Sequence, residues 1–321
     1  MDKKILIFSG DPNSINSEII FKCWKNINSN TKKRIYVISN HKLIKSQFKK
    51  LGYFSKFENV KNINDLSSSV SLKILNVDLK FKNPFNVPVE ECKKFMRKSL
   101  NLAHKLSLNP VVSGLINCPI NKNLLDNKNE GLTEFFARKC KTKKNSEVML
   151  ITNGKFSVCP ITTHIDLKDV SKRINSKILV EKIKTIDSWY KKFKKKKPKI
   201  CLLGLNPHNS EYRKNSVEQK IIIPTMKKLK IKGINIQGPF SADTIFIKEY
   251  KNFDVVVGMY HDQVLSPFKA LFKFDAINIT LGLKYLRVSP DHGIAKNLLN
   301  KKKANPISLL KCIKFISKFK K

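Results

Sequence analysis

Short runs rich in Ile, Val, Leu and Phe alternate along the chain with longer stretches whose apolar residues recur at helical spacing. In the segment 89–108, for example, Val89, Cys92 and Phe95 would share one face of a helix. Strands are predicted at 3–9, 34–39, 71–78, 111–118, 147–152, 156–163, 199–205, 234–237, 254–260, 276–280 and 285–289, and helices from 17, at 41–52, 89–108, 168–193, 215–230, after 262 and at 307–319. This alternation predicts an α/β fold with a mostly parallel sheet and helices on both faces.

The composition is that of a protein with a hydrophobic core. The chain has 321 residues, of which 41% are hydrophobic, enough for one large or two medium domains. Its seven cysteines are odd in number and form no CxxC pair, which favours reduced thiols in a cytoplasm over disulfides or a zinc knuckle. No apolar run has the length of a membrane span, and the start MDKKILIFSGDPN is typical of a first strand rather than a signal peptide.

The charge is strongly positive, with 64 Lys and Arg against 24 Asp and Glu and a formal net charge of +40. Such a balance raises the hypothesis of a nucleic-acid-binding protein. The lysines, however, are dispersed along the whole chain, and the basic runs at 191–199, 300–305 and 318–321 lack the aromatic or glycine interleaving that is typical of single-strand-binding surfaces. We therefore predict no nucleic-acid partner, although a positive field would attract anionic substrates.

Four of the six histidines follow a predicted strand. They are His164, His208, His261 and His292. In open α/β sheets, ligands and catalytic groups gather at the carboxyl ends of the strands. The repeated placement therefore points to one site and to an enzyme.

Three of these histidines suggest two kinds of chemistry. His164, His208 and His261 come from different strand ends, so together they could hold one divalent metal and leave a position open for substrate. Alternatively, a histidine could act as a general base together with Asp262 or Asp243. Sequence spacing leaves both hypotheses open.

Residues suited to an anionic substrate follow His261. Lys269 and Arg287 suit a phosphate or carboxylate, and Asn278 lies within an apolar strand, where a buried amide needs partners. The turn 10–19, GDPNSINSEI, also offers a helix N-terminus to an anion, but with a single glycine it is a weak nucleotide motif.

Eight motifs follow one another along the chain: GDP…E near the start, CPINK (118–122), GLTEFFA (131–137), TTHIDLKDV (162–170), GLNPH (204–208), GPFSADTIF (238–246), YHDQ (260–263) and INITLGLKYLRVSPDHG (277–293). Taken together, these motifs resemble the 4-hydroxythreonine-4-phosphate dehydrogenase family of pyridoxal phosphate biosynthesis. Their order and spacing are far more specific than any one of them.

The resemblance implies a fold similar to that of isocitrate and isopropylmalate dehydrogenases, with two α/β/α domains and a cleft between them. Residues 1–125 and 275–321 would form the first domain, with both termini. Residues 126–274 would form the second, contributing the metal site and the dimer interface. The family forms cytoplasmic homodimers that share the active site.

The implied reaction is the NAD- or NADP-dependent oxidation of 4-phosphohydroxy-L-threonine to a ketone, followed by loss of carbon dioxide to give 3-amino-2-oxopropyl phosphate. A divalent metal (Zn, Mg or Co) would stabilise the developing alkoxide. By position, the resemblance assigns His164, His208 and His261 to the metal, Thr133, Lys269, Asn278 and Arg287 to the phosphorylated substrate, Asp291, His292 and Gly293 to the dinucleotide, and Lys122 to catalysis. Asp262, the partner considered above for a histidine base, is the second catalytic candidate.

The chain departs from the family pattern in three places. Leu132 replaces the usual histidine before Thr133, the N-terminal loop has Ser14, Asn16 and Ser17 in place of glycines and a proline, and NSEYRKNS (209–216) replaces a glycine-rich stretch. Leu132 opens the alternative of a related substrate, such as threonate or erythronate 4-phosphate. A metal-dependent hydrolase or lyase without a dinucleotide is a further alternative.

Overall fold

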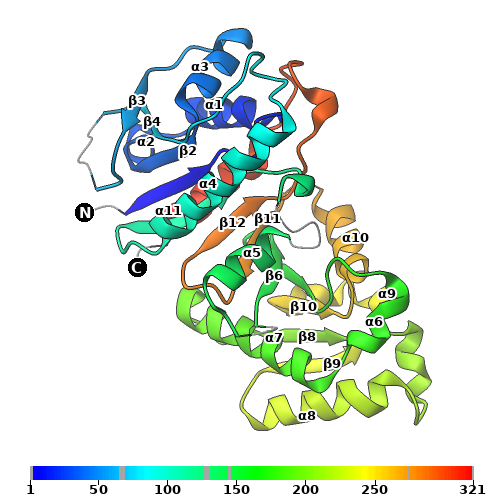
Figure 1. Ribbon diagram of the computed structural model, residues 1–321. Coiled ribbons are helices and arrows are strands. Elements are labelled where there is room, and N and C mark those ends of the chain that lie inside the picture. Colours follow the sequence, from blue (N-terminus) through cyan, green and yellow to red (C-terminus); the bar gives the residue numbers. More distant parts are fainter. Residues whose placement is uncertain (1–2, 65–68, 126–130, 144–145, 274, 320–321) are drawn as a thin grey trace. The chain divides into compact units, whose positions relative to one another are not determined.

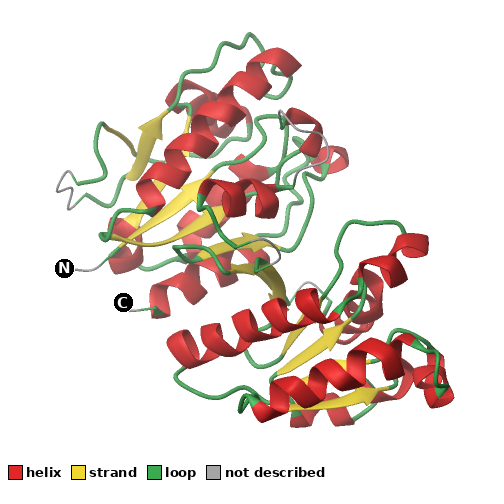
Figure 2. Ribbon diagram, turned by 60° about the horizontal axis from the view of Figure 1, so that its bottom comes forward, coloured by secondary structure: helices red, strands yellow, loops and turns green. Residues whose placement is uncertain are grey.

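The computed structural model describes residues 3–64, 69–125, 131–143, 146–273 and 275–319, which form two compact units. Unit 1 comprises residues 1–139 and 284–321, and unit 2 comprises residues 140–283. The predicted domain boundaries fall at 126 and 274, positions that lie outside the described residues. Both units alternate strands with helices (Figures 1 and 2), which confirms the predicted mixed α/β class. The predicted cleft between two domains stays a prediction.

Unit 1 is built on a parallel sheet. Its strands lie in the order β3 (Phe57–Val60), β4 (Leu72–Asn76), β2 (Ile35–Ser39), β1 (Lys4–Phe8), β5 (Val112–Asn117) and β12 (Arg287–Pro290). Each adjacent pair is parallel. The chain moves outward from β1 through β2 to the edge strand β3, and then runs back through β4 to β5. Right-handed crossovers therefore place the helix that joins β4 to β5 on the opposite face from the helices between β1, β2 and β3.

The helices of unit 1 follow this rule. α1 (Asn16–Asn26) packs against α3 (His41–Lys50) and α11 (Ile307–Lys318), whereas α4 (Val89–Ser107) packs on β5, β1 and β2 (Figure 1). The predicted apolar face of α4 is buried at Cys92 and Phe95. The side chain of Asn40 begins α3 by accepting the Leu43 amide at 2.9 Å. Unit 1 also contains α2 (Ser29–Arg34), η1 (Lys122–Leu124), α5 (Leu132–Lys139) and η6 (Lys296–Leu298).

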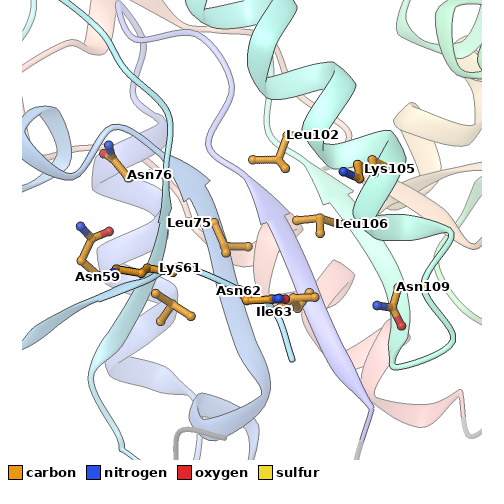
Figure 3. A pocket seen from close by; sticks show the side chains of 11 residues that line it. Asn59, Lys61, Asn62, Ile63, Leu75, Asn76, Leu102, Lys105, Leu106 and Asn109 are labelled. Atoms are coloured by element: carbon orange, nitrogen blue, oxygen red, sulfur yellow. The ribbon is translucent and has the colours of Figure 1, made fainter. Parts of the chain in front are cut away.

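A hollow of about 580 Å³ lies in unit 1 beside the connection from β3 to β4 (Figure 3). Among the described residues, the connection from β3 to β4 contains no helix, so the helical side of the hollow is formed by α4. The floor is apolar, with Leu75 and Leu106, and exposed Lys61 and Lys105 lie at its edge. None of the residues that line this hollow is a predicted site residue.

Unit 2 has a mixed sheet. Its strands lie in the order β11 (Ile277–Leu281), β6 (Val148–Thr152), β7 (Ser157–Pro160), β10 (Val255–Gly258), β8 (Ile200–Leu203) and β9 (Ile236–Phe240). Strands β7, β10, β8 and β9 are parallel, but β6 is antiparallel to both of its neighbours. The turn of four residues between β6 and β7 allows only antiparallel pairing, because a parallel pair needs a long crossover.

The helices of unit 2 cover both faces of its sheet. α7 (Ser176–Trp189) contacts β6 and β11, α8 (Ile223–Ile231) contacts β9, and α10 (His261–Phe272) packs on β7 and β10. The remaining elements are α6 (Leu167–Arg173), η2 (Tyr190–Lys194), η3 (Pro207–Tyr212), η4 (Glu218–Ile222), α9 (Ala242–Ile245) and η5 (Glu249–Asn252). Val264, Leu265 and Phe268 of α10 enter the core of this unit.

The prediction of one helix over 168–193 is wrong. The chain breaks at Ile174 and Asn175, between α6 and α7. Asn175 has extended backbone angles, and its side chain accepts the Ile178 amide at 3.0 Å, which begins a new helix. No described helix is long and apolar enough to cross a membrane.

Candidate functional site

Three neighbouring strands of unit 2 end at one edge of its sheet. β10 lies between β7 and β8, with Gly258 paired to Pro160 and Val257 paired to Leu202. Each strand is followed within a few residues by a predicted metal ligand: His164 after β7, His261 after β10 and His208 after β8. Parallel pairing in this register therefore carries the three histidines to the same edge of the sheet.

Two of the three imidazoles lie together. The ring centroids of His164 and His261 are 5.9 Å apart. His261 donates through Nδ1 to Oδ1 of Asp262 at 2.6 Å, a contact that orients the ring and leaves Nε2 for a ligand. Of the two carboxylates considered as partners of a histidine base, Asp262 makes this contact, and Asp243 lies on α9.

His208 lies in η3, where its backbone is left-handed. Among the described residues, no group of three or more His, Cys, Asp or Glu side chains is arranged to hold a metal ion. The donor set nevertheless fits a divalent transition metal, because imidazole nitrogen is its commonest protein ligand. His208 is thus the third imidazole at this edge of the sheet, carried by the loop after β8.

Gln263 links two of these strand ends. Its Oε1 accepts the Met259 amide at 2.6 Å, and its Nε2 donates to the Gly204 carbonyl at 2.7 Å. The residue thus fixes the end of β10 against the end of β8. Gln263 belongs to the YHDQ motif, but it is not among the predicted site residues, because a glutamine that bridges two strands has no signature in the sequence of either strand.

In unit 1, Arg287 forms a buried cationic centre. The residue is 4% exposed and lies at the start of β12. Nε donates to Asn117 Oδ1 at 2.7 Å, Nη1 donates to Thr133 Oγ1 at 3.0 Å, and the guanidinium lies 5.2 Å from the Phe136 ring. Burial lowers the pKa of Arg287 to about 10, so the side chain stays charged at neutral pH. Thr133 and Arg287, both predicted to bind substrate, are brought together; Asn117 was not predicted.

Lys269 and Asn278 belong to unit 2. Lys269 is exposed in the last turn of α10. Asn278 lies in β11, and its Oδ1 is buried without a hydrogen-bond partner among the described residues. A buried amide oxygen in this state costs stability unless a ligand supplies a donor. Asn278 was predicted to need hydrogen-bond partners, and its buried amide oxygen has no donor among the described residues.

The remaining predicted residues lie in unit 1. Lys122 opens η1, directly after Asn121, whose side chain accepts the Asn123 amide. The Asp291 amide donates to Ser308 Oγ at 2.9 Å, which ties this segment to α11.

His292 and Gly293 follow Asp291. His292 Nδ1 lies 2.9 Å from the Gly293 carbonyl, and Nε2 is buried without a partner among the residues described. Burial lowers the pKa of His292. A neutral imidazole with an unsatisfied Nε2 is thus available to a ligand in this segment.

The chain has two α/β units, and its histidines follow adjacent strand ends, an arrangement typical of α/β enzymes. Residues 31–316 match the model of the family described as pyridoxal phosphate biosynthetic protein PdxA, and the chain belongs to this family. It is 38% identical over 317 residues to a 4-hydroxythreonine-4-phosphate dehydrogenase from Sulfurihydrogenibium sp., covering 97% of this chain and 96% of the relative. A relative of the same name from Aquifex aeolicus is 34% identical, with 98% of each chain covered.

Solved structures agree with this assignment. A 4-hydroxythreonine-4-phosphate dehydrogenase from Klebsiella pneumoniae matches with a TM-score of 0.85 and 26% identity, covering 99% of this chain and 98% of that one. A putative 4-hydroxythreonine-4-phosphate dehydrogenase from Salmonella typhimurium matches with a TM-score of 0.86 and 26% identity, covering 99% of both chains. The resemblance seen in the sequence is confirmed, and the chain is a dehydrogenase.

Proposed function

We propose that this enzyme oxidises 4-phosphohydroxy-L-threonine with NAD or NADP, and that the resulting β-keto acid loses carbon dioxide to give 3-amino-2-oxopropyl phosphate for pyridoxal phosphate biosynthesis. The names of its relatives support this substrate. The observation that carries the proposal is the delivery of His164, His261 and His208 to one sheet edge by β7, β10 and β8.

These three histidines would hold a divalent metal, with Zn or Co better suited than Mg to an imidazole set. When bound, the metal would act as a Lewis acid toward the substrate hydroxyl oxygen. Asp262 would keep His261 oriented through the bond to Nδ1. Lys122, at the start of η1, is the candidate for proton transfer through Nζ.

The substrate phosphate would be bound by Arg287 and Lys269, with Thr133 and Asn278 as hydrogen-bonding residues. The charge and donor fork of Arg287 suit a phosphate. The segment Asp291, His292 and Gly293 would contact the dinucleotide. We further propose a cytoplasmic homodimer that shares its active site, with neither nucleic acid nor membrane as a partner.

A second substrate class is favoured by Leu132. It stands at the start of α5, next to Thr133, and its side chain can neither donate a hydrogen bond nor carry charge. Threonate or erythronate 4-phosphate is therefore the alternative substrate, oxidised by the same chemistry.

The test supplies 4-phosphohydroxy-L-threonine, then the two alternative phosphates, with NAD or NADP, and follows absorbance at the NADH wavelength. We expect NADH formation that is lost after chelation and falls at least about 100-fold in His164→Ala, His208→Ala or His261→Ala. His41→Ala, on α3 of unit 1, is the matched control and should keep wild-type activity. Full activity of a metal-stripped sample would refute the metal site, and product without NADH would indicate a hydrolase or lyase.

A further inference from the structure

The loop after β8 has an unusual backbone. Five consecutive residues have positive φ angles between 48° and 55°: His208, Asn209, Ser210, Glu211 and Tyr212. None of them is glycine, and each left-handed residue with a Cβ atom costs about 1–2 kcal/mol. A run of this length persists only where its surroundings hold it.

The Glu218 carboxylate provides such a hold. Glu218 opens η4 and is 0% exposed. Its Oε1 accepts the amides of Leu205 and Asn206, both at 2.9 Å, and its Oε2 accepts the Ser210 hydroxyl at 3.1 Å. The Asn206 side-chain amide lies 3.3 Å from each carboxylate oxygen. One carboxylate therefore binds the loop on both sides of His208.

Close packing beneath the loop supports the same arrangement. Asn209 donates through Nδ2 to the Pro239 carbonyl at 3.2 Å. A Cβ atom on Gly204 would lie 2.1 Å from Asn209 Oδ1 and 3.4 Å from Glu218 Oε1, so a larger residue at this position would displace the Asn209 side chain. Burial by itself would raise the pKa of Glu218, but the hydrogen bonds from Asn206 and Leu205 outweigh it, and the pKa lies below its usual value. The charged form is the one that holds the loop.

We propose that Glu218 is the positioning residue for His208: its carboxylate clamps the loop 205–210 on both sides of the histidine and so determines whether the third imidazole can join His164 and His261 on a divalent metal. The inference rests on the metal site proposed above. Glu218 acts through the loop and touches neither substrate nor metal. Glu218 lies ten residues beyond His208 and therefore outside the GLNPH motif (204–208).

Glu218→Gln is the informative variant. Glutamine keeps the size of the side chain, but it has one acceptor oxygen where the carboxylate has two, so it cannot accept hydrogen bonds on both sides of His208. Asp254→Asn is the matched control. The Asp254 carboxylate also accepts a backbone amide beside β8, that of Lys199 at 2.9 Å, but at the opposite end of the strand. Both variants weaken one carboxylate clamp in the same unit.

The measurement is a calorimetric titration of metal-free protein with Zn²⁺, repeated with Co²⁺ and its absorption spectrum. We expect Glu218→Gln to weaken metal binding by about 10- to 100-fold, the usual effect of losing a residue that orients a ligand. Asp254→Asn should bind metal like the wild type. Hydrogen exchange of the Leu205 and Asn206 amides should accelerate in Glu218→Gln only, which reports on the loop without any metal.

The outcomes separate the two proposals. If His208→Ala binds metal like the wild type, the proposed metal site is wrong. If His208→Ala weakens binding and Glu218→Gln does not, or if Asp254→Asn weakens it equally, the positioning role of Glu218 is overturned. Should Glu218→Gln fail to fold, Ser210→Ala removes the hydroxyl contact to Oε2 and leaves the contacts of Leu205 and Asn206 in place. A several-fold loss of affinity would support the role, and wild-type affinity would refute it.

Discussion

The buried guanidinium of Arg287 gives the sharpest prediction on substrate binding. Arg287→Met keeps much of the volume and the contact with Phe136, but it removes the charge and both hydrogen bonds. If Arg287 serves to bind phosphate, the variant should lose activity far more than stability. If it serves only to hold α5 against β5, stability should suffer most.

The expected change in stability follows from two opposing effects. The fall in the pKa of Arg287 to about 10 corresponds to a burial cost of about 3 kcal/mol, at 1.36 kcal/mol for each pKa unit. Two hydrogen bonds from a charged donor contribute about 3–6 kcal/mol. The variant avoids the burial cost of the charge and loses the contribution of the hydrogen bonds. Its free energy of unfolding should therefore fall by about 0–3 kcal/mol.

The expected loss of activity is about 10- to 100-fold in kcat/KM on the phosphorylated substrate, equivalent to about 1.5–3 kcal/mol. The penalty should shrink on an analogue that lacks the phosphate. Arg34→Met is a control in the same unit, since Arg34 donates through Nε to the Lys3 carbonyl at 2.8 Å. An equal penalty on both substrates would show that Arg287 does not bind the phosphate.

Three further predictions concern single residues. Leu132→His should raise kcat/KM on 4-phosphohydroxy-L-threonine by up to about 100-fold, by giving a substrate oxygen a partner; efficient wild-type turnover with no gain would show that Leu132 is compensated. Glu211→Gly should raise the free energy of unfolding by about 1 kcal/mol or less. The relief of backbone strain at this left-handed residue should exceed the cost of the entropy that glycine adds to the unfolded chain. A destabilised variant would show that the backbone at Glu211 is not strained. Burial lowers the pKa of His292, so protons favour the unfolded chain. Urea unfolding of the wild type should therefore show lower stability at pH 5.5 than at pH 7.5, and His292→Asn should reduce the difference.

Much of the fold could be predicted because periodicity is a local property. The runs at 3–9 and 111–118 became β1 and β5, and the apolar face over 89–108 became α4. The break at Asn175 was missed because a single capping contact outweighed an otherwise continuous helical pattern. The elements α2, β3 and α5 are not among those predicted, because they are short and lack a long periodic run.

Site residues could be predicted only where a local sequence pattern identifies them. A histidine at the end of an apolar run is visible in sequence, and the pairing of β7, β10 and β8 explains why His164, His261 and His208 reach one edge. The contact between Arg287 and Asn117 joins residues 170 positions apart. Such contacts depend on side-chain direction across strands, which no spacing rule encodes.

The loop after GLNPH shows how a departure from a family pattern can be absorbed. Glycine would allow a left-handed backbone without a steric cost, whereas residues 209–212, the first half of NSEYRKNS, adopt it with side chains present. Those side chains also bring contacts that glycine lacks, since Ser210 binds Glu218 and Asn209 binds the Pro239 carbonyl. The chain therefore replaces conformational freedom by hydrogen bonds that specify one backbone path. On this reasoning the lost glycines do not count against a metal site at His208; they make its geometry depend on the buried carboxylate of Glu218.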